Sequence, residues 1–330
     1  MLFRNPIINN MNYKVSILIP VYNNEAVVEN CLCSVFEQQL NEIEYIIIDD
    51  CSTDGSLNLC RVVVDRYPHR KQHTTIIANE QNQGIATVRQ MLIDNAHGEY
   101  IYFVDSDDWI EPYAASMMYE KAKAEDADIV GSNYFINTCD SERVIEYVYP
   151  SESKDCLNLF LRMSIKPVIW LFIFRRQLFM EHLITFAPDI NIMEDYIVGT
   201  KLLFHANKIA HIDAPAYHYR IGNNFYSRDS ATYFQVAEKA IRMAENYLQL
   251  HGDCSDFEDS LLQRKLILKS KFLFENMSLD SRRYLNTFPE ANGCCRRFDI
   301  FPLKQKLLML LAEKHFHWFF AILRKIRKQH

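Results

Sequence analysis

Short apolar runs alternate with amphipathic helical patterns through the first 104 residues, and this alternation limits the possible folds more than any other feature of the chain. The apolar runs cover 15–19, 44–48, 74–78 and 100–104, and the helical patterns cover 25–38, 56–67 and 86–96. Alternation of this kind predicts βαβ units and a parallel sheet. Because the runs are almost continuously apolar, we expect helices on both faces of that sheet. The predicted fold class is therefore α/β with a mostly parallel sheet.

Polar residues follow each of these runs, at 20–24, 49–55, 79–84 and 105–108. The carboxyl ends of parallel strands meet at one edge of a sheet, which is where open α/β sheets bind ligands. The last of the four segments is the most acidic, with three carboxylates in four residues. Such a cluster suits Mg²⁺ or Mn²⁺ and predicts a metal that faces a phosphate-bearing substrate. The alternative is a solvated acidic turn that precedes a helix beginning at Glu111-Pro112.

Composition excludes several classes of protein. With 330 residues, 49% hydrophobic and 24% charged, the chain can form a large core and an additional helical part. A net charge of −6 argues against general nucleic-acid binding. The nine cysteines are odd in number and include no C-x-x-C pair, which favours reduced thiols over disulfides or a zinc site.

The remaining patterns predict the domain organisation. Residues 1–14 lack the apolar block of a secretory signal, and no stretch reaches the length that a spanning helix requires, so we expect a cytoplasmic protein. The predicted division is an N-terminal extension at 1–13, a catalytic domain at 14–225 and a helical C-terminal region at 226–330. Further strands are expected at 127–132 and 209–212, and further helices at 194–206, 231–250, 256–277 and 303–328.

Four segments together resemble the ordered motifs of family 2 glycosyltransferases. They are Ile-Pro-Val-Tyr-Asn at 19–23, Ile-Asp-Asp-Cys-Ser-Thr-Asp-Gly-Ser at 48–56, Asn82-Gln83-Gly84 with Arg89, and Asp-Ser-Asp-Asp at 105–108. The resemblance extends over roughly residues 14–222. It implies a GT-A (Rossmann-like) fold, a nucleotide-sugar donor such as a UDP-sugar, a divalent metal (Mn²⁺ or Mg²⁺) and inversion at the anomeric carbon.

The resemblance also implies roles for individual residues on the donor side. Tyr22 would stack on the base, Asp50 would accept a hydrogen bond from uracil, and Gly84 would let the backbone pass close to the ligand. The complete implied donor set is Pro20, Tyr22, Asn23, Asp50, Asn82, Gly84, Arg89 and Asp105. Two alternatives stay open, since Tyr22 could be a packed aromatic at the rim and Arg89 could pair with a loop aspartate.

The chemical step needs a metal and a base. By resemblance, Asp105 would contact the ribose or a metal-bound water, and Asp107 would bind the metal that bridges both phosphates. Asp108 would assist the metal or cap the following helix. Asp195 matches the family's general base and Glu194 its neighbour, at a helix start where N–H groups favour charged carboxylates. The alternative for this pair is helix stabilisation alone.

Three more residues resemble family positions near the acceptor or the donor diphosphate. Trp170 could stack on a sugar ring or belong to the core. His218 and Arg220 resemble a motif that closes over the donor diphosphate, and the alternative for His218 is an ordinary surface histidine.

Residues 303–330 contain seven Lys or Arg residues and one Glu, a net charge of +6, which leaves −12 for the rest of the chain. Aromatic and aliphatic residues lie among these cations. Such a helix can lie in the headgroup region of an anionic bilayer, so we expect peripheral association with the inner membrane leaflet. The alternative is packing on its own domain or on a second subunit, and whether the protein oligomerises stays open.

The predicted function is that of an inverting glycosyltransferase that transfers a sugar to a hydroxyl of a glycan or lipid-linked acceptor in cell-surface polysaccharide biosynthesis. A non-catalytic nucleotide-sugar-binding module is the alternative. It would not need a base, so Glu194-Asp195 argues against it.

Overall fold

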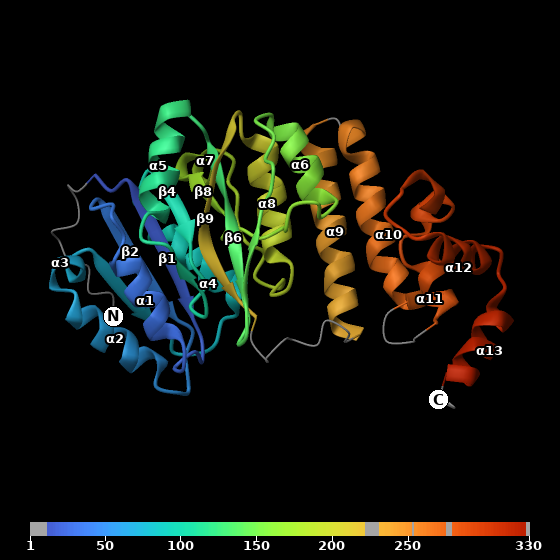
Figure 1. Ribbon diagram of the computed structural model, residues 1–330, viewed down its shortest axis with the longest axis horizontal. Helices are drawn as coiled ribbons and strands as arrows, with labels where there is room; N and C mark the ends of the chain where they lie inside the picture. Colours follow the sequence, from blue (N-terminus) through green and yellow to red (C-terminus); the bar gives the residue numbers. More distant parts are fainter. Residues whose placement is uncertain (1–11, 222–230, 253, 275–278, 328–330) are drawn as a thin grey trace. The chain divides into compact units, whose positions relative to one another are not determined.

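The computed structural model describes residues 12–221, 231–252, 254–274 and 279–327. The predicted extension at 1–13 lies almost wholly outside these ranges, as does the predicted boundary after 225. The chain divides into two compact units (Figure 1). The sheet unit comprises 1–157 with 168–224, and the helical unit comprises 158–167 with 225–330.

Four parallel strands form the first half of the sheet, in the order β3-β2-β1-β4. They are β1 (Val15–Val21), β2 (Ile43–Asp49), β3 (Thr74–Ala78) and β4 (Tyr100–Phe103). Every residue of β1, β2 and β4 is buried, which requires cover on both faces. The helices between them are α1 (Val28–Phe36), α2 (Ser56–Arg66), α3 (Pro68–Lys71) and α4 (Ile85–Asp94). The predicted α/β class and all the elements predicted in this half are confirmed.

The second half of the sheet is mixed. Strand β8 (Phe172–Arg175) runs antiparallel to β4, and β6 (Ile129–Asn137) runs antiparallel to β8. Strand β9 (Ile209–Arg220) is parallel to β6 and antiparallel to the short β5 (Trp109–Ile110). Parallel order therefore holds for the first four strands and for the β6–β9 pair, while the other pairings are antiparallel.

Strand β9 is much longer than the four-residue strand that the sequence predicted, and this length helps to build the site. Its last residues pair with β5, so that His218 lies opposite Trp109 in the register. The end of β9 is thereby held directly beside the acidic turn at 105–108. Strand β7 (Glu142–Ile145), which pairs with β6, was not predicted.

The other helices of the sheet unit are α5 (Ala114–Glu125), α7 (Arg176–Glu181) and α8 (Glu194–His205). The division between the units falls within α6 (Ser153–Leu161), after Leu157. The helical unit contains α9 (Ala231–His251), α10 (Glu258–Phe274), α11 (Ser281–Asn286), α12 (Leu303–Glu313), α13 (His317–Arg327) and short 3₁₀ turns at 254–257, 289–291 and 294–297. The single helix predicted at 303–328 is thus two helices, with His315 between them in the left-handed region at φ 60°.

Two further findings concern the whole described chain. None of its helices is long and apolar enough to cross a membrane. All nine cysteines are free in the structure.

Candidate active site

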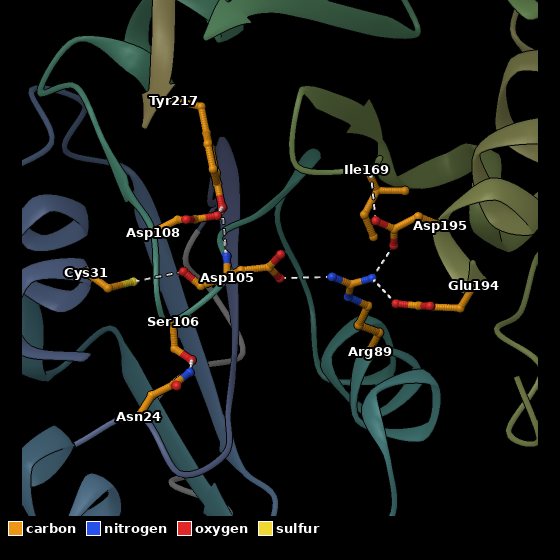
Figure 2. A network of polar contacts seen from close by, with 10 residues as sticks. All are labelled: Asn24, Cys31, Arg89, Asp105, Ser106, Asp108, Ile169, Glu194, Asp195 and Tyr217. Atoms are coloured by element: carbon orange, nitrogen blue, oxygen red, sulfur yellow. Dashed lines mark hydrogen bonds and ion pairs between the residues drawn. The ribbon is translucent and has the colours of Figure 1, made fainter. Parts of the chain in front are cut away.

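Arg89 lies at the centre of the site and binds three carboxylates (Figure 2). One terminal nitrogen, Nη2, donates to Asp105 Oδ1 at 2.9 Å, and the other, Nη1, donates to Glu194 Oε1 at 2.6 Å and to Asp195. Only 4% of the Arg89 side chain is exposed. A single buried guanidinium therefore joins the acidic turn after β4 to the start of α8, although these segments are about ninety residues apart in the sequence.

The sequence left open whether Arg89 pairs with an aspartate, and the structure shows this pairing with Asp105. It also shows partners in α8 that no local pattern indicated. The place of Arg89 near the donor stays a prediction, and its bond to Asp105 links it to the acidic turn.

Asp195 and Glu194 are both buried and compete for the same cation. Burial, opposed by Arg89 and reinforced by the charge of Glu194, raises the pKa of Asp195 to about 8. Burial likewise raises the pKa of Glu194 above its ordinary value. The second oxygen of Asp195 accepts a hydrogen bond from the Ile169 backbone N–H at 3.4 Å. The pair is therefore suited to hold and release a proton near neutral pH.

The acidic turn gives its carboxylates different environments. Asp108 is 2% exposed, and its two oxygens accept hydrogen bonds from the Tyr217 hydroxyl at 2.8 Å and the Arg220 backbone N–H at 2.7 Å. The same Tyr217 hydroxyl accepts a hydrogen bond from the Asp105 N–H at 3.1 Å. Asp108 therefore ties the turn to β9. It does not cap α5, whose N-cap is Tyr113, so that prediction was wrong.

Asp107 is exposed, and its carboxylate has no partner among the residues that the structure describes. Partial desolvation of this carboxylate and the charge of Asp105 raise the pKa of Asp107 to about 6. A cation would relieve that repulsion. Within the described residues, no three His, Cys, Asp or Glu side chains gather into a metal site. Asp105 and Asp107 nevertheless fit Mg²⁺ or a similar ion, because such ions are often held by one or two carboxylates together with substrate phosphates.

Asp50 organises the loop at 79–84. Its carboxylate accepts hydrogen bonds from the backbone N–H groups of Gln83 at 2.8 Å and Gly84 at 2.9 Å, and from the Asn79 amide at 2.9 Å. The Asn82 amide approaches the Asp50 carbonyl at 3.4 Å. Asp50 thus has a structural role that the sequence did not reveal, and its hydrogen bond to uracil stays a prediction.

Gly84 adopts φ +82°, and a Cβ at this position would lie 2.6 Å from the Asn191 amide. Asn191 Oδ1 accepts a hydrogen bond from the Ala86 N–H at 3.1 Å, near the start of α4. The group that approaches Gly84 is therefore a side chain of the protein itself, whereas the sequence predicted a ligand there. Asn191 was missed because no spacing or motif links it to α4.

The loop after β1 is bound to its neighbours. The Asn23 side-chain oxygen accepts a hydrogen bond from the Thr53 N–H at 2.8 Å, and the Asn24 amide donates to Ser106 Oγ at 2.7 Å. Pro20 is buried within β1. Tyr22 in contrast is 46% exposed, so its ring is available to a ligand. The loop that carries Tyr22 and Asn23 is thus connected to the acidic turn by the hydrogen bond from Asn24 to Ser106.

Trp170 does not face the site. It is 2% exposed and stacks on Tyr217 at 4.3 Å between ring centroids and on Tyr219 at 5.4 Å. Of the two alternatives that the sequence left open for Trp170, the structure shows the core position, with an edge-to-face contact to Tyr134.

His218 is also buried, with its ring stacked between those of Trp109 at 4.7 Å and Phe135 at 4.2 Å. Its Nε2 lies 2.9 Å from Glu111 Oε1 and its Nδ1 lies 3.3 Å from Glu142 Oε2. The alternative of a surface position is therefore wrong for His218, because its ring is buried and both ring nitrogens lie close to carboxylates. Its role near a donor diphosphate stays a prediction.

Arg220 lies next to the acidic turn at 105–108. Its Nε donates to the Asp107 carbonyl oxygen at 3.0 Å, and its guanidinium carbon lies 4.8 Å from the centroid of the Trp109 ring. This position is compatible with the predicted role over a donor diphosphate, which stays a prediction.

Comparison with known proteins agrees with this geometry. A family model described as Glycosyl transferase family 2 matches residues 16–182, which is half of the chain, so the chain belongs to glycosyl transferase family 2. The structure is similar to that of S. aureus TarS 1–349 in complex with UDP-GlcNAc, with a TM-score of 0.67 over 96% of this chain and 92% of that one, at 18% identity. This similarity confirms the predicted fold, a Rossmann-like sheet with C-terminal helices.

Two curated relatives are also similar in sequence. The putative glycosyltransferase EpsH of Bacillus subtilis is 30% identical over 63% of this chain. The poly(ribitol-phosphate) beta-glucosyltransferase of Bacillus spizizenii is 31% identical over 60% of this chain. The aligned part of the chain spans 60% of the first relative and 30% of the second.

Proposed function

We propose that the protein is an inverting glycosyltransferase that transfers a sugar from a nucleoside-diphosphate sugar to a hydroxyl group. One observation carries the proposal: Arg89 places the acidic turn, with its unpartnered Asp107, next to the buried Glu194–Asp195 pair. The first group suits a metal and a diphosphate, and the second suits a proton transfer. A sugar carbon between them would meet a leaving group on one side and an attacking hydroxyl on the other.

Each group has a role in this reaction. Asp105 and Asp107 would hold Mn²⁺ or Mg²⁺, which when bound neutralises charge on the departing diphosphate. Asp195 would take the proton from the acceptor hydroxyl, and Arg89 would keep both groups in place. No further carboxylate was assigned as a covalent nucleophile, so a single displacement with inversion is the simplest course.

The relatives support a more specific donor and acceptor. TarS is described in complex with UDP-GlcNAc, and a curated relative is a glucosyltransferase acting on poly(ribitol-phosphate). We infer that the donor here is a UDP-sugar and that the acceptor is a glycan or lipid-linked glycan of cell-surface polysaccharide synthesis. The enzyme would bind peripherally at the inner leaflet of the membrane, where a lipid-linked acceptor would be found.

A non-catalytic nucleotide-sugar-binding protein is the alternative. It would need Tyr22, Asp50 and the acidic turn, but it would gain nothing from two buried carboxylates on one guanidinium. Burying charges is costly, so the Glu194–Asp195 arrangement favours an enzyme.

Calorimetry tests the metal-assisted part of the proposal. The wild-type protein should bind UDP in the presence of Mn²⁺ or Mg²⁺, and Asp107→Asn should weaken this binding at least tenfold. Leu250→Gln, an exposed substitution in the helical unit, is the matched control and should bind as the wild type does. Metal-independent affinity, or no affinity for UDP in well-folded protein, would contradict the proposal.

A further inference from the structure

Helices α12 and α13 are fixed to their own unit by one face. Met309, Ala312 and Phe320 are at most 1% exposed. The Tyr284 hydroxyl donates to Glu313 at 2.9 Å, and Arg324 donates to the Leu279 carbonyl at 2.9 Å. One side of each helix is therefore buried against the rest of its own unit.

The other side of each helix exposes large apolar residues. Leu303 and Leu307, one turn apart in α12, are 84% and 56% exposed. Trp318 and Ile322, one turn apart in α13, are 61% and 49% exposed, and Phe316 between the helices is 37% exposed. Residues at i and i+4 lie on one face, so each helix has its own exposed apolar stripe. Single exposed apolar residues are ordinary, but five within twenty residues are not.

Cations accompany these stripes. Lys304, Lys314 and Lys325 are exposed, and the described residues provide no ion pair for any of them. The one acid of the two helices, Glu313, is occupied by the Tyr284 hydroxyl and by the Gly293 N–H at 2.9 Å. Within the described part of α12 and α13 the exposed residues are therefore apolar or positive, and the one lysine with an ion pair is Lys306, with Asp299 at 3.1 Å.

We propose that α12 and α13 together form a membrane-binding surface for anionic phospholipid. Trp318, Ile322, Leu303 and Leu307 enter the boundary between headgroups and acyl chains, while the lysines bind the phosphates around them. Charge complementarity selects this occupant, because the two helices are positive and the membrane is negative. The inference rests on the proposed function only in assigning the surface to the inner leaflet of the membrane.

Vesicle flotation of the full chain tests the surface directly. The protein should float with vesicles of phosphatidylcholine mixed with phosphatidylglycerol, and not with phosphatidylcholine alone. The double variant Trp318→Gln/Ile322→Gln and the double variant Lys304→Glu/Lys325→Glu should each lose at least tenfold in partitioning. Leu250→Gln is the matched control for Leu303→Gln, because the two leucines are 82% and 84% exposed. Of these two single variants, Leu303→Gln should weaken vesicle binding and Leu250→Gln should not.

Trp318 supplies a second measurement. Its emission should move to shorter wavelength on vesicle binding, and the Trp318→Phe variant should lose that shift, because Trp170 is buried and Trp109 is covered by His218. Equal flotation of every variant, or no flotation of the wild type, would overturn the proposal. Dimerisation that the double variants abolish, without vesicle binding, would instead assign this surface to a second copy of the chain. UDP binding should be measured on the same variants. If vesicle binding is lost while UDP binding is kept, only the membrane surface has been removed; if the wild type does not bind UDP, the proposed function fails independently of the surface.

Discussion

The acidic turn after β4 and the acidic start of α8 look alike in sequence, but the structure treats their carboxylates differently. In the turn, Asp105 accepts a hydrogen bond from Arg89, Asp107 is exposed to solvent, and Asp108 accepts a hydrogen bond from Tyr217 of β9. At the start of α8, Glu194 and Asp195 both accept hydrogen bonds from the buried Arg89 guanidinium. The turn thus leaves one carboxylate free for an external cation, while α8 keeps both of its carboxylates inside the protein.

This difference separates two kinds of chemistry. A carboxylate that reaches solvent can exchange metal and phosphate ligands, because nothing in the described protein has to move away first. Two carboxylates that share one cation in a buried place favour a proton between them, because the net charge is then smaller. Under the proposed function, the acidic turn would bind the metal and the start of α8 would transfer the proton, and Arg89 contacts both regions.

The largest effect expected is that of Asp195→Asn. Loss of a general base typically slows a reaction by about 10²- to 10⁴-fold, and we expect UDP release from a UDP-sugar to slow by that amount while calorimetric UDP binding is unchanged. The wild-type kcat/KM should rise with pH through the pKa of Asp195, about 8, because the base acts only when deprotonated. This rise should be missing from the variant. Unchanged turnover in Asp195→Asn would refute the assignment of the base.

Arg89→Met should have the next largest effect, on stability. It leaves Asp105, Glu194 and Asp195 near one another without their cation, and removing one partner of a buried ion pair typically costs about 3–5 kcal/mol. Urea unfolding measures this loss. Arg89→Lys should cost less than Arg89→Met but should not restore the wild type, because a single ammonium cannot reach partners on both sides as the planar guanidinium does. Equal stability of all three proteins would show that the two regions are held together by other contacts.

The first half of the sheet could be predicted because its strands are continuously apolar. Residues 15–19 and 44–48 are buried on both faces, so their composition alone marks them as strands. Polar loops at the carboxyl ends of parallel strands share an edge of the sheet, and the hydrogen bond from the Asn24 amide to Ser106 Oγ joins two of the predicted loops.

The second half could not be predicted in the same way. Strand β9 is interrupted by the exposed Asp213 and by Pro215, so only its first four residues resembled a strand. The burial of His218 and Trp170 depends on ring contacts between β5, β6 and β9, which local patterns do not encode. The partners of Arg89 in α8 are more than a hundred residues away from it, and no spacing rule connects them.

The smallest effect expected distinguishes two adjacent residues of the turn. The two carboxylate oxygens of Asp108 accept hydrogen bonds from the Tyr217 hydroxyl and the Arg220 N–H. The amide of Asp108→Asn has only one acceptor oxygen, so one of these two buried donors loses its partner. An unsatisfied buried donor typically costs about 1–3 kcal/mol, and the urea midpoint should fall accordingly. Asp107→Asn is the matched control, since its carboxylate is exposed and has no described partner, and it should change stability by less than about 0.5 kcal/mol. If Asp107→Asn were the more destabilising of the two, the division of the turn into a structural and a ligand-binding carboxylate would be wrong.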